Sequence, residues 1–129
     1  PEIIIKCLLG KEIITTPGEQ TREFNFVDNI IEGMLVLTSK INNSFKAINL
    51  GSNKPIKIKS LVKKIHKLTN SKSKLKIGKK NYRPNEIWKM QADNRFILKK
   101  TNWKPTIKLD QGLKISINWY RKFIKTYYN

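Results

Sequence analysis

The sequence predicts an α/β chain of mixed helices and short strands that does not hold a complete sheet of its own. Apolar residues recur with helical spacing in several stretches, most clearly over residues 27–39. Short β-branched or aromatic runs lie between these stretches, each long enough only for a short strand. Strands this short and scattered are expected when they normally join a sheet supplied by sequence outside the chain.

The first half of the chain predicts two helices and three strands. We expect the end of a helix that Gly10 stops, then two strands around the turn Pro17-Gly18, a helix, and a strand closed by Gly51. In chain order these elements cover residues 2–9, 12–16, 22–26, 27–39 and 45–50.

The second half predicts a helix capped by Ser60, a weak strand over residues 74–77 and a loop over residues 78–91. Asp93 and Asp110 are placed to start two further helices, since carboxylates accept hydrogen bonds from free N–H groups at helix starts. Nothing divides the chain, so residues 1–129 are treated as one unit.

The charge is strongly positive, with 27 Lys and Arg against 9 Asp and Glu and a net charge of +18. One interpretation is a basic, non-enzymatic nucleic-acid-binding module. The other is compositional drift, since Lys, Ile and Asn dominate together and the lysines are spread from Lys6 to Lys125. No zinc-finger spacing or aromatic ribonucleoprotein motif is present, so we favour drift and keep nucleic acid as the alternative.

Several classes are excluded by composition. Cys7 is the only cysteine, so the chain can form neither an internal disulfide nor a Cys₄ or Cys₂His₂ zinc site, and we expect no metal site. No run approaches the roughly 20 apolar residues that span a bilayer. The start, at Pro1, has no signal-peptide pattern and no initiator Met. We therefore expect a cytoplasmic protein and a sequence that begins inside a longer chain.

Four spaced segments together resemble the extended short-chain dehydrogenase/reductase family, which holds UDP-glucose 4-epimerase and the sugar-nucleotide 4,6-dehydratases. Residues 18–29, GEQTREFNFVDN, are similar to the family's Gly-x-Gln-x-Arg-Asp-Phe-x-Tyr-Val-Asp-Asp. Residues 47–52, AINLGS, and residues 83–86, RPNE, are similar to its Tyr-Asn-Ile-Gly-Ser and Arg-Pro-Gly-Asp. The fourth resemblance is to Ala-Asp, Leu-Gly-Trp-x-Pro and Gly-Leu…Trp-Tyr, and it lies at residues 92–93, 103–105, 112–113 and 119–120.

The resemblance implies a nucleotide-sugar site. Arg22 and Arg83 match arginines that bind the nucleotide diphosphate, a role suited to forked, charge-assisted hydrogen bonds. Asn49 matches a residue that helps hold the nucleotide, with a plain strand-end turn as its alternative. Gln20 and Glu86 are weaker candidates, and Glu86 is placed to orient Arg83. We expect both arginines to face one pocket.

The family's dinucleotide turn and its catalytic Tyr-x-x-x-Lys have no counterpart here, so we expect no catalytic and no cofactor-binding residue in this chain. The resemblance therefore implies the carboxy-terminal, substrate-binding half of an NAD-dependent nucleotide-sugar epimerase or dehydratase. The missing half would bind NAD and oxidise the hexose at C4, while this half positions the sugar. Family membership also implies a homodimer for the complete enzyme.

Overall fold

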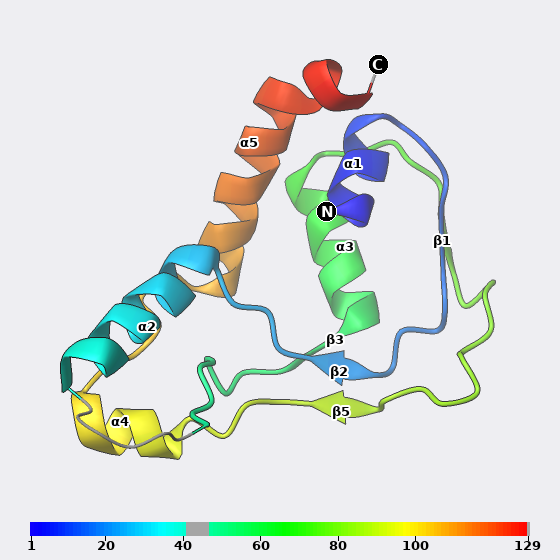
Figure 1. The fold of residues 1–129 in the computed structure, drawn as a ribbon. Helices are drawn as coiled ribbons and strands as arrows, with labels where there is room; N and C mark the ends of the chain where they lie inside the picture. The colour runs from blue at the N-terminus through cyan, green and yellow to red at the C-terminus, as the bar shows by residue number, and fades with distance from the viewer. Residues whose placement is uncertain (41–46, 129) are drawn as a thin grey trace.

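The computed structural model describes residues 1–40 and 47–128, which form five helices and five short strands (Figure 1). The helices are α1 Glu2–Leu8, α2 Val27–Lys40, α3 Ile58–Leu68, α4 Arg95–Thr101 and α5 Leu109–Tyr128. The strands are β1 Ile13–Thr15, β2 Thr21–Arg22, β3 Ile56–Lys57, β4 Leu75–Ile77 and β5 Lys89–Met90. The mixed α/β class predicted from the sequence is confirmed.

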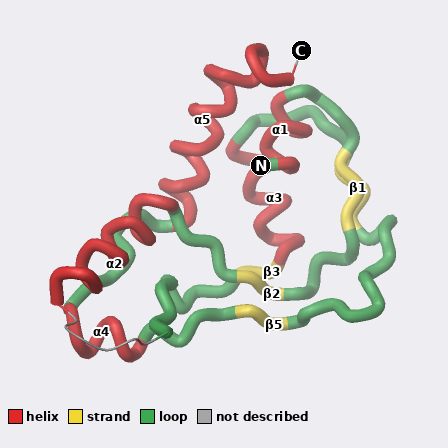
Figure 2. The backbone as a smooth tube through the Cα atoms, in the orientation of Figure 1, coloured by secondary structure: helices red, strands yellow, loops and turns green. Residues whose placement is uncertain are grey.

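The strands pair in two small groups (Figure 2). β1 and β4 pair in parallel, with Ile13 opposite Leu75. In the second group β2 lies between β3 and β5, antiparallel to β3 and parallel to β5. Each group is smaller than a stable independent sheet, as expected for strands that lack neighbours.

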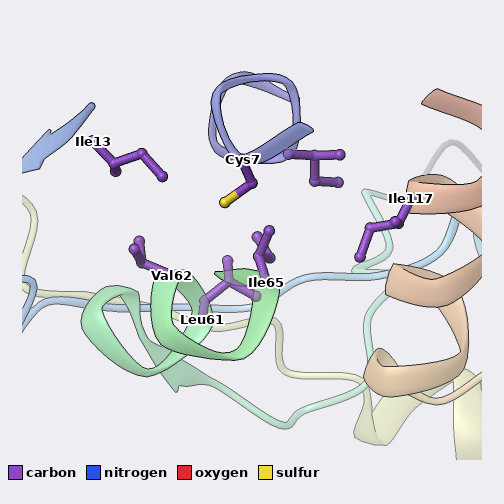
Figure 3. Packing of buried hydrophobic residues seen from close by; sticks show 7 residues of the cluster. Cys7, Ile13, Leu61, Val62, Ile65 and Ile117 are labelled. Carbon is purple, nitrogen blue, oxygen red and sulfur yellow. The ribbon is translucent and has the colours of Figure 1, made fainter. Parts of the chain in front are cut away.

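The hydrophobic core lies between α1, α3, α5 and β1. Figure 3 shows the Cys7 side chain of α1 directed toward α3, and Ile117 of α5 approaching from the side. The most deeply buried members, Ile13 and Ile117, are 0% and 1% exposed. The sequence builds this core through the helical spacing of Leu61, Val62 and Ile65 on α3.

Helix α2 is apolar on two faces, and only one of them is covered among the described residues. Its inner face packs closely: a Cβ added at Gly33 would lie 2.8 Å from a Leu50 methyl carbon and 3.0 Å from the Trp103 ring. On the outer face, Met34 is 56% and Leu35 64% exposed. A helix with apolar residues on all sides is normally buried on all sides, so another body is needed to cover this face.

Two strand predictions are wrong in part. The strand expected over residues 22–26 is only two residues long and covers Thr21–Arg22. The carboxylate of the next residue, Glu23, accepts hydrogen bonds from loop N–H groups. Of the strand expected over residues 45–50, residues 45 and 46 lie outside the described part, and residues 47–50 form no strand. Within the described residues, no strand pairs with them.

The three predicted helix caps are also displaced. Helix α3 begins at Ile58, with Lys57 as its N-cap, so Ser60 lies in the first turn. Helix α4 has Asn94 as its N-cap, although Asp93 still accepts a hydrogen bond from the Arg95 backbone N–H. Asp110 lies inside the first turn of α5 and pairs with Lys64 at 2.7 Å. The three helices thus start one to three residues before or after the positions that the predicted caps implied.

Candidate functional site

Strand β2 forms the centre of the candidate site, because it carries Arg22 between two neighbouring strands. Arg22 lies opposite Ile56 on one side and Met90 on the other. The chain enters β2 through Gly18, whose φ of +71° suits glycine. The Gly18 carbonyl accepts a 2.9 Å hydrogen bond from the Lys59 N–H, and an added Cβ would lie 2.6 Å from that nitrogen. The glycine thus lets β2 start directly beside α3.

Arg22 is held by an ion pair with Glu86. Its Nη2 lies 2.8 Å from a Glu86 carboxylate oxygen, and its Nη1 donates a 2.8 Å hydrogen bond to the Thr21 carbonyl. The Arg22 and Glu86 side chains are only 21% and 13% exposed, so this ion pair is largely shielded from water. The expectation that Glu86 orients Arg83 is not met, because the structure pairs this carboxylate with Arg22.

Arg83 lies in the loop between β4 and β5, three residues before Glu86, and it is exposed. The preceding residue anchors this loop, since the Tyr82 hydroxyl accepts a 2.9 Å hydrogen bond from the Glu19 N–H and its ring meets Trp88 edge-on at 4.8 Å. The loop therefore brings Arg83 into the neighbourhood of the segment that carries Arg22, while the Arg83 guanidinium itself has no hydrogen bond or ion pair among the described residues.

The two remaining candidates lie in different surroundings. Gln20 is 8% exposed, and its carbonyl accepts a 3.0 Å hydrogen bond from the Ile58 N–H at the start of α3. Its side-chain oxygen is buried without a partner. Asn49 is exposed on the irregular segment that precedes Gly51. The structure thus gathers Gln20, Arg22 and Glu86 around β2, and no hydrogen bond joins Asn49 to them.

Glu23, which stands where the family segment has Asp, is a further important residue that the sequence analysis did not single out. One carboxylate oxygen accepts hydrogen bonds from the backbone N–H groups of Ser52 and Asn53, the latter at 3.1 Å. The other accepts one from the Ala92 N–H at 2.9 Å. Glu23 therefore ties the segments on both sides of β2 to it without using a cation.

The pKa of Glu23 reflects these contacts. Burial raises the pKa of this carboxyl, but hydrogen bonds from the Ala92 backbone, the Asn25 amide and the backbones of Asn53 and Ser52 together lower it below its ordinary value. The carboxylate is therefore the form that holds the loops together.

Two cavities among the described residues do not coincide with the predicted site. The larger, of about 660 Å³, lies between the loops before α2, before β3 and before α5, with the start and middle of α4 closing it. The smaller, of about 270 Å³, lies between α1, α3 and α5. None of the five candidate residues lines either cavity. Neither of these two cavities is therefore the expected pocket that contains both Arg22 and Arg83.

The described residues do not fit NAD or a metal ion. Binding the pyrophosphate of a dinucleotide needs a glycine-rich turn between a strand and a helix. Three strand-to-helix junctions occur among the described residues, at 23–26, 57–58 and 91–94, and none of them contains a glycine. Within residues 1–40 and 47–128, no three His, Cys, Asp or Glu side chains form a possible metal site. His66 instead contacts the Ser73 carbonyl through Nε2 at 2.9 Å.

Comparison with known proteins places the fold in one family. The family described as GDP-mannose 4,6 dehydratase matches residues 1–116, which is most of the chain. The protein belongs to this family of extended short-chain dehydrogenases/reductases, the NAD-dependent epimerases and dehydratases. The resemblance stated from the four sequence segments is therefore confirmed.

Individual relatives agree with this membership. A UDP-glucuronate 4-epimerase of Thermodesulfobacterium geofontis is 29% identical over 109 residues, which are 84% of this chain and 32% of that protein. The structure of Thermotoga maritima UDP-glucose 4-epimerase with UDP-glucose has a TM-score of 0.85 at 24% identity, covering 95% of this chain and 39% of that one. A Bordetella bronchiseptica enzyme, WbmF, in complex with NADH, has a TM-score of 0.81 at 23% identity, covering 98% and 37%.

The chain spans about a third of the length of the curated relatives it matches, 34% and 32% for two of them. The prediction of NAD as the family's cofactor is confirmed, since solved members of the fold hold NADH or NAD. The comparisons favour this family over the nucleic-acid alternative. No helix in the described part of the chain is both long and apolar enough to cross a membrane.

Proposed function

We propose that residues 1–129 are the nucleotide-sugar-binding part of an NAD-dependent epimerase or dehydratase, and that NAD and the catalytic residues belong to a part that this sequence does not contain. The share of the relatives' length supports this division, as does the missing dinucleotide turn. The exposed outer face of α2 supports it as well, because Met34 and Leu35 lack a cover among the described residues.

The nucleotide diphosphate is bound by Arg22 and Arg83 in this proposal, with Gln20, Asn49 and Glu86 beside them. The observation that supports this proposal most is the Arg22–Glu86 ion pair, which fixes a mostly buried guanidinium next to the loop that carries Arg83. A fixed, shielded guanidinium loses little side-chain freedom on meeting a phosphate. The free guanidinium of Arg83 supplies a second cation when that loop closes on the ligand.

The role of this part in the reaction is positioning. Holding the diphosphate leaves the hexose directed away from this part, toward the nicotinamide of the complete enzyme. We propose oxidation of the hexose at C4 as the step that this positioning serves, with a homodimer as the working assembly. Epimerisation and dehydration both begin from such a step, so the proposal covers both.

Calorimetry with UDP-glucose tests the site. Arg22→Ala and Arg83→Ala should each weaken binding about tenfold, the loss expected for a charged hydrogen-bonding partner. Arg95→Ala is the matched control, because Arg95 is 86% exposed and pairs only with its neighbour Asp93. Unchanged affinity in both site variants, with folding verified by circular dichroism, would contradict the assignment. Sedimentation of the complete enzyme tests the homodimer.

A further inference from the structure

The larger cavity carries an excess of positive charge on its wall. Three lysines line it, Lys54, Lys104 and Lys108, and they come from two loops separated by about fifty positions in the chain. Among the described residues, none of the three ammonium groups forms an ion pair. The cavity therefore carries unneutralised positive charge.

The one carboxylate at the cavity does not offset this charge. Asp110 lines the wall, but one of its oxygens accepts a 2.7 Å hydrogen bond from Lys64, which lies outside the cavity. Its negative charge is thus already shared with a fourth lysine. The net effect at the cavity is a positive potential, which a concave site with apolar walls concentrates.

The rest of the wall is mainly apolar. Phe24, Ile56, Leu98 and Ile107 contribute side chains from four different segments. A volume of about 660 Å³ is in the range of small-molecule sites, which combine apolar walls with a few polar groups. Asn25, Ser52 and Asn94 add uncharged polar groups to the wall, and the charged groups are three lysines against one aspartate. A ligand that matches this wall combines an apolar body with a compact negative charge.

We propose that this cavity is a binding site for an organic phosphomonoester, with the phosphate on the three lysines and the apolar part against Phe24 and Ile107. A phosphate dianion suits three point charges better than a single carboxylate does. The site is separate from the one in the proposed function, because Arg22 and Arg83 do not line the cavity. It stands whether or not that function holds.

Phenyl phosphate is the probe, titrated by calorimetry at about 0.15 M ionic strength, where surface attraction is largely screened. The test variant combines Lys54→Ala, Lys104→Ala and Lys108→Ala. The control combines Lys63→Ala, Lys67→Ala and Lys72→Ala, three exposed lysines that do not line the cavity. Both variants lose three charges, so a general charge effect would weaken them equally.

We expect the cavity variant to lose at least about tenfold in affinity and the control to stay within about twofold. Inorganic phosphate should bind more weakly than phenyl phosphate, because it cannot use the apolar wall. Equal losses in both variants would overturn the proposal, as would no binding to the unmodified chain. All substituted lysines are exposed, and thermal unfolding followed by circular dichroism verifies that both variants fold.

Competition separates this proposal from the proposed function. Excess UDP-glucose should leave phenyl phosphate binding unchanged, and Arg22→Ala should leave it unchanged too. Two results together would identify the cavity as the nucleotide-sugar site: displacement of phenyl phosphate by UDP-glucose, and loss of UDP-glucose binding in the cavity variant. They would overturn the proposal of a separate site.

Discussion

The Arg22 guanidinium and the Glu86 carboxylate lie 2.8 Å apart, joined across 64 positions of sequence. Both side chains are mostly buried, so each depends on the other for its charge to be compensated. The pair also sets the position of the β4–β5 loop relative to β2. A change at Glu86 should therefore affect both folding and the availability of Arg22.

Glu86→Gln should lower the free energy of unfolding by about 1–3 kcal/mol, because the Arg22 charge loses its partner in a shielded place. Urea denaturation measures the change. Asp110→Asn is the control, since its pair with Lys64 is far more exposed, with 61% of the Asp110 side chain accessible. That control should cost under about 1 kcal/mol. Equal effects of the two changes would show that the burial of the Arg22 pair is unimportant.

Glu23→Gln should destabilise the protein at neutral pH and flatten its acid sensitivity. The folded-state pKa of Glu23 is lowered, so its contribution is present above the unfolded pKa of about 4.3 and is lost as the pH falls through the lower folded value. Thermal unfolding over a pH series measures this. The unmodified protein should lose stability more steeply than the variant in that acidic window.

Glu19 provides the contrast for this pH effect. Hydrogen bonds from Lys57 and Lys59 lower the pKa of Glu19 to about 2, but the carboxylate is exposed. Both Glu19 and Glu23 contribute to the loss of stability at acidic pH. High salt should remove most of the contribution of the exposed Glu19, while the contribution of Glu23 should persist. If both effects vanish in salt, Glu23 is not shielded as the structure implies.

Asn29 should be a strong determinant of stability. It is 1% exposed and joins α2 to the loop before α5. Its amide accepts 3.0 Å hydrogen bonds from the N–H groups of Thr106 and Ile107 and donates one of 2.8 Å to the Ile107 carbonyl. Asn29→Ala leaves three partly buried backbone groups without this partner and should cost about 2–4 kcal/mol by chemical denaturation.

Asn29→Asp separates the acceptor role from the donor role, because it retains the two accepted hydrogen bonds and loses only the donated one. It should destabilise less than Asn29→Ala. A larger loss in the Asp variant would mean that burying the charge outweighs the retained hydrogen bonds.

The two faces of α2 should respond differently to substitution. Leu35→Lys on the outer face should change the free energy of unfolding by under about 0.5 kcal/mol and reduce self-association in light scattering. Gly33→Ala on the inner face should cost about 1–3 kcal/mol, because the added methyl meets Leu50 and Trp103. A stability loss from Leu35→Lys comparable to that from Gly33→Ala would show that the outer face is already covered in the isolated chain.

Helix periodicity and the family segments were readable from the sequence alone. The helix that carries Leu61, Val62 and Ile65 and the short strand that ends at Ile77 were both predicted, because each follows from local chemistry. Such features depend on residues a few positions apart, so the sequence displays them directly. Family membership followed because its motifs are short and keep their order.

The partners of polar groups were decided only by the tertiary structure. Arg22 meets Glu86, Glu23 meets the Ala92 backbone, and Asn29 meets Ile107, in each case across more than sixty positions. Long-range pairs of this kind depend on how the segments pack, and one charged side chain can satisfy many possible partners. For the same reason the sequence could not reveal that three scattered lysines share one cavity, or that one face of α2 is left without a cover.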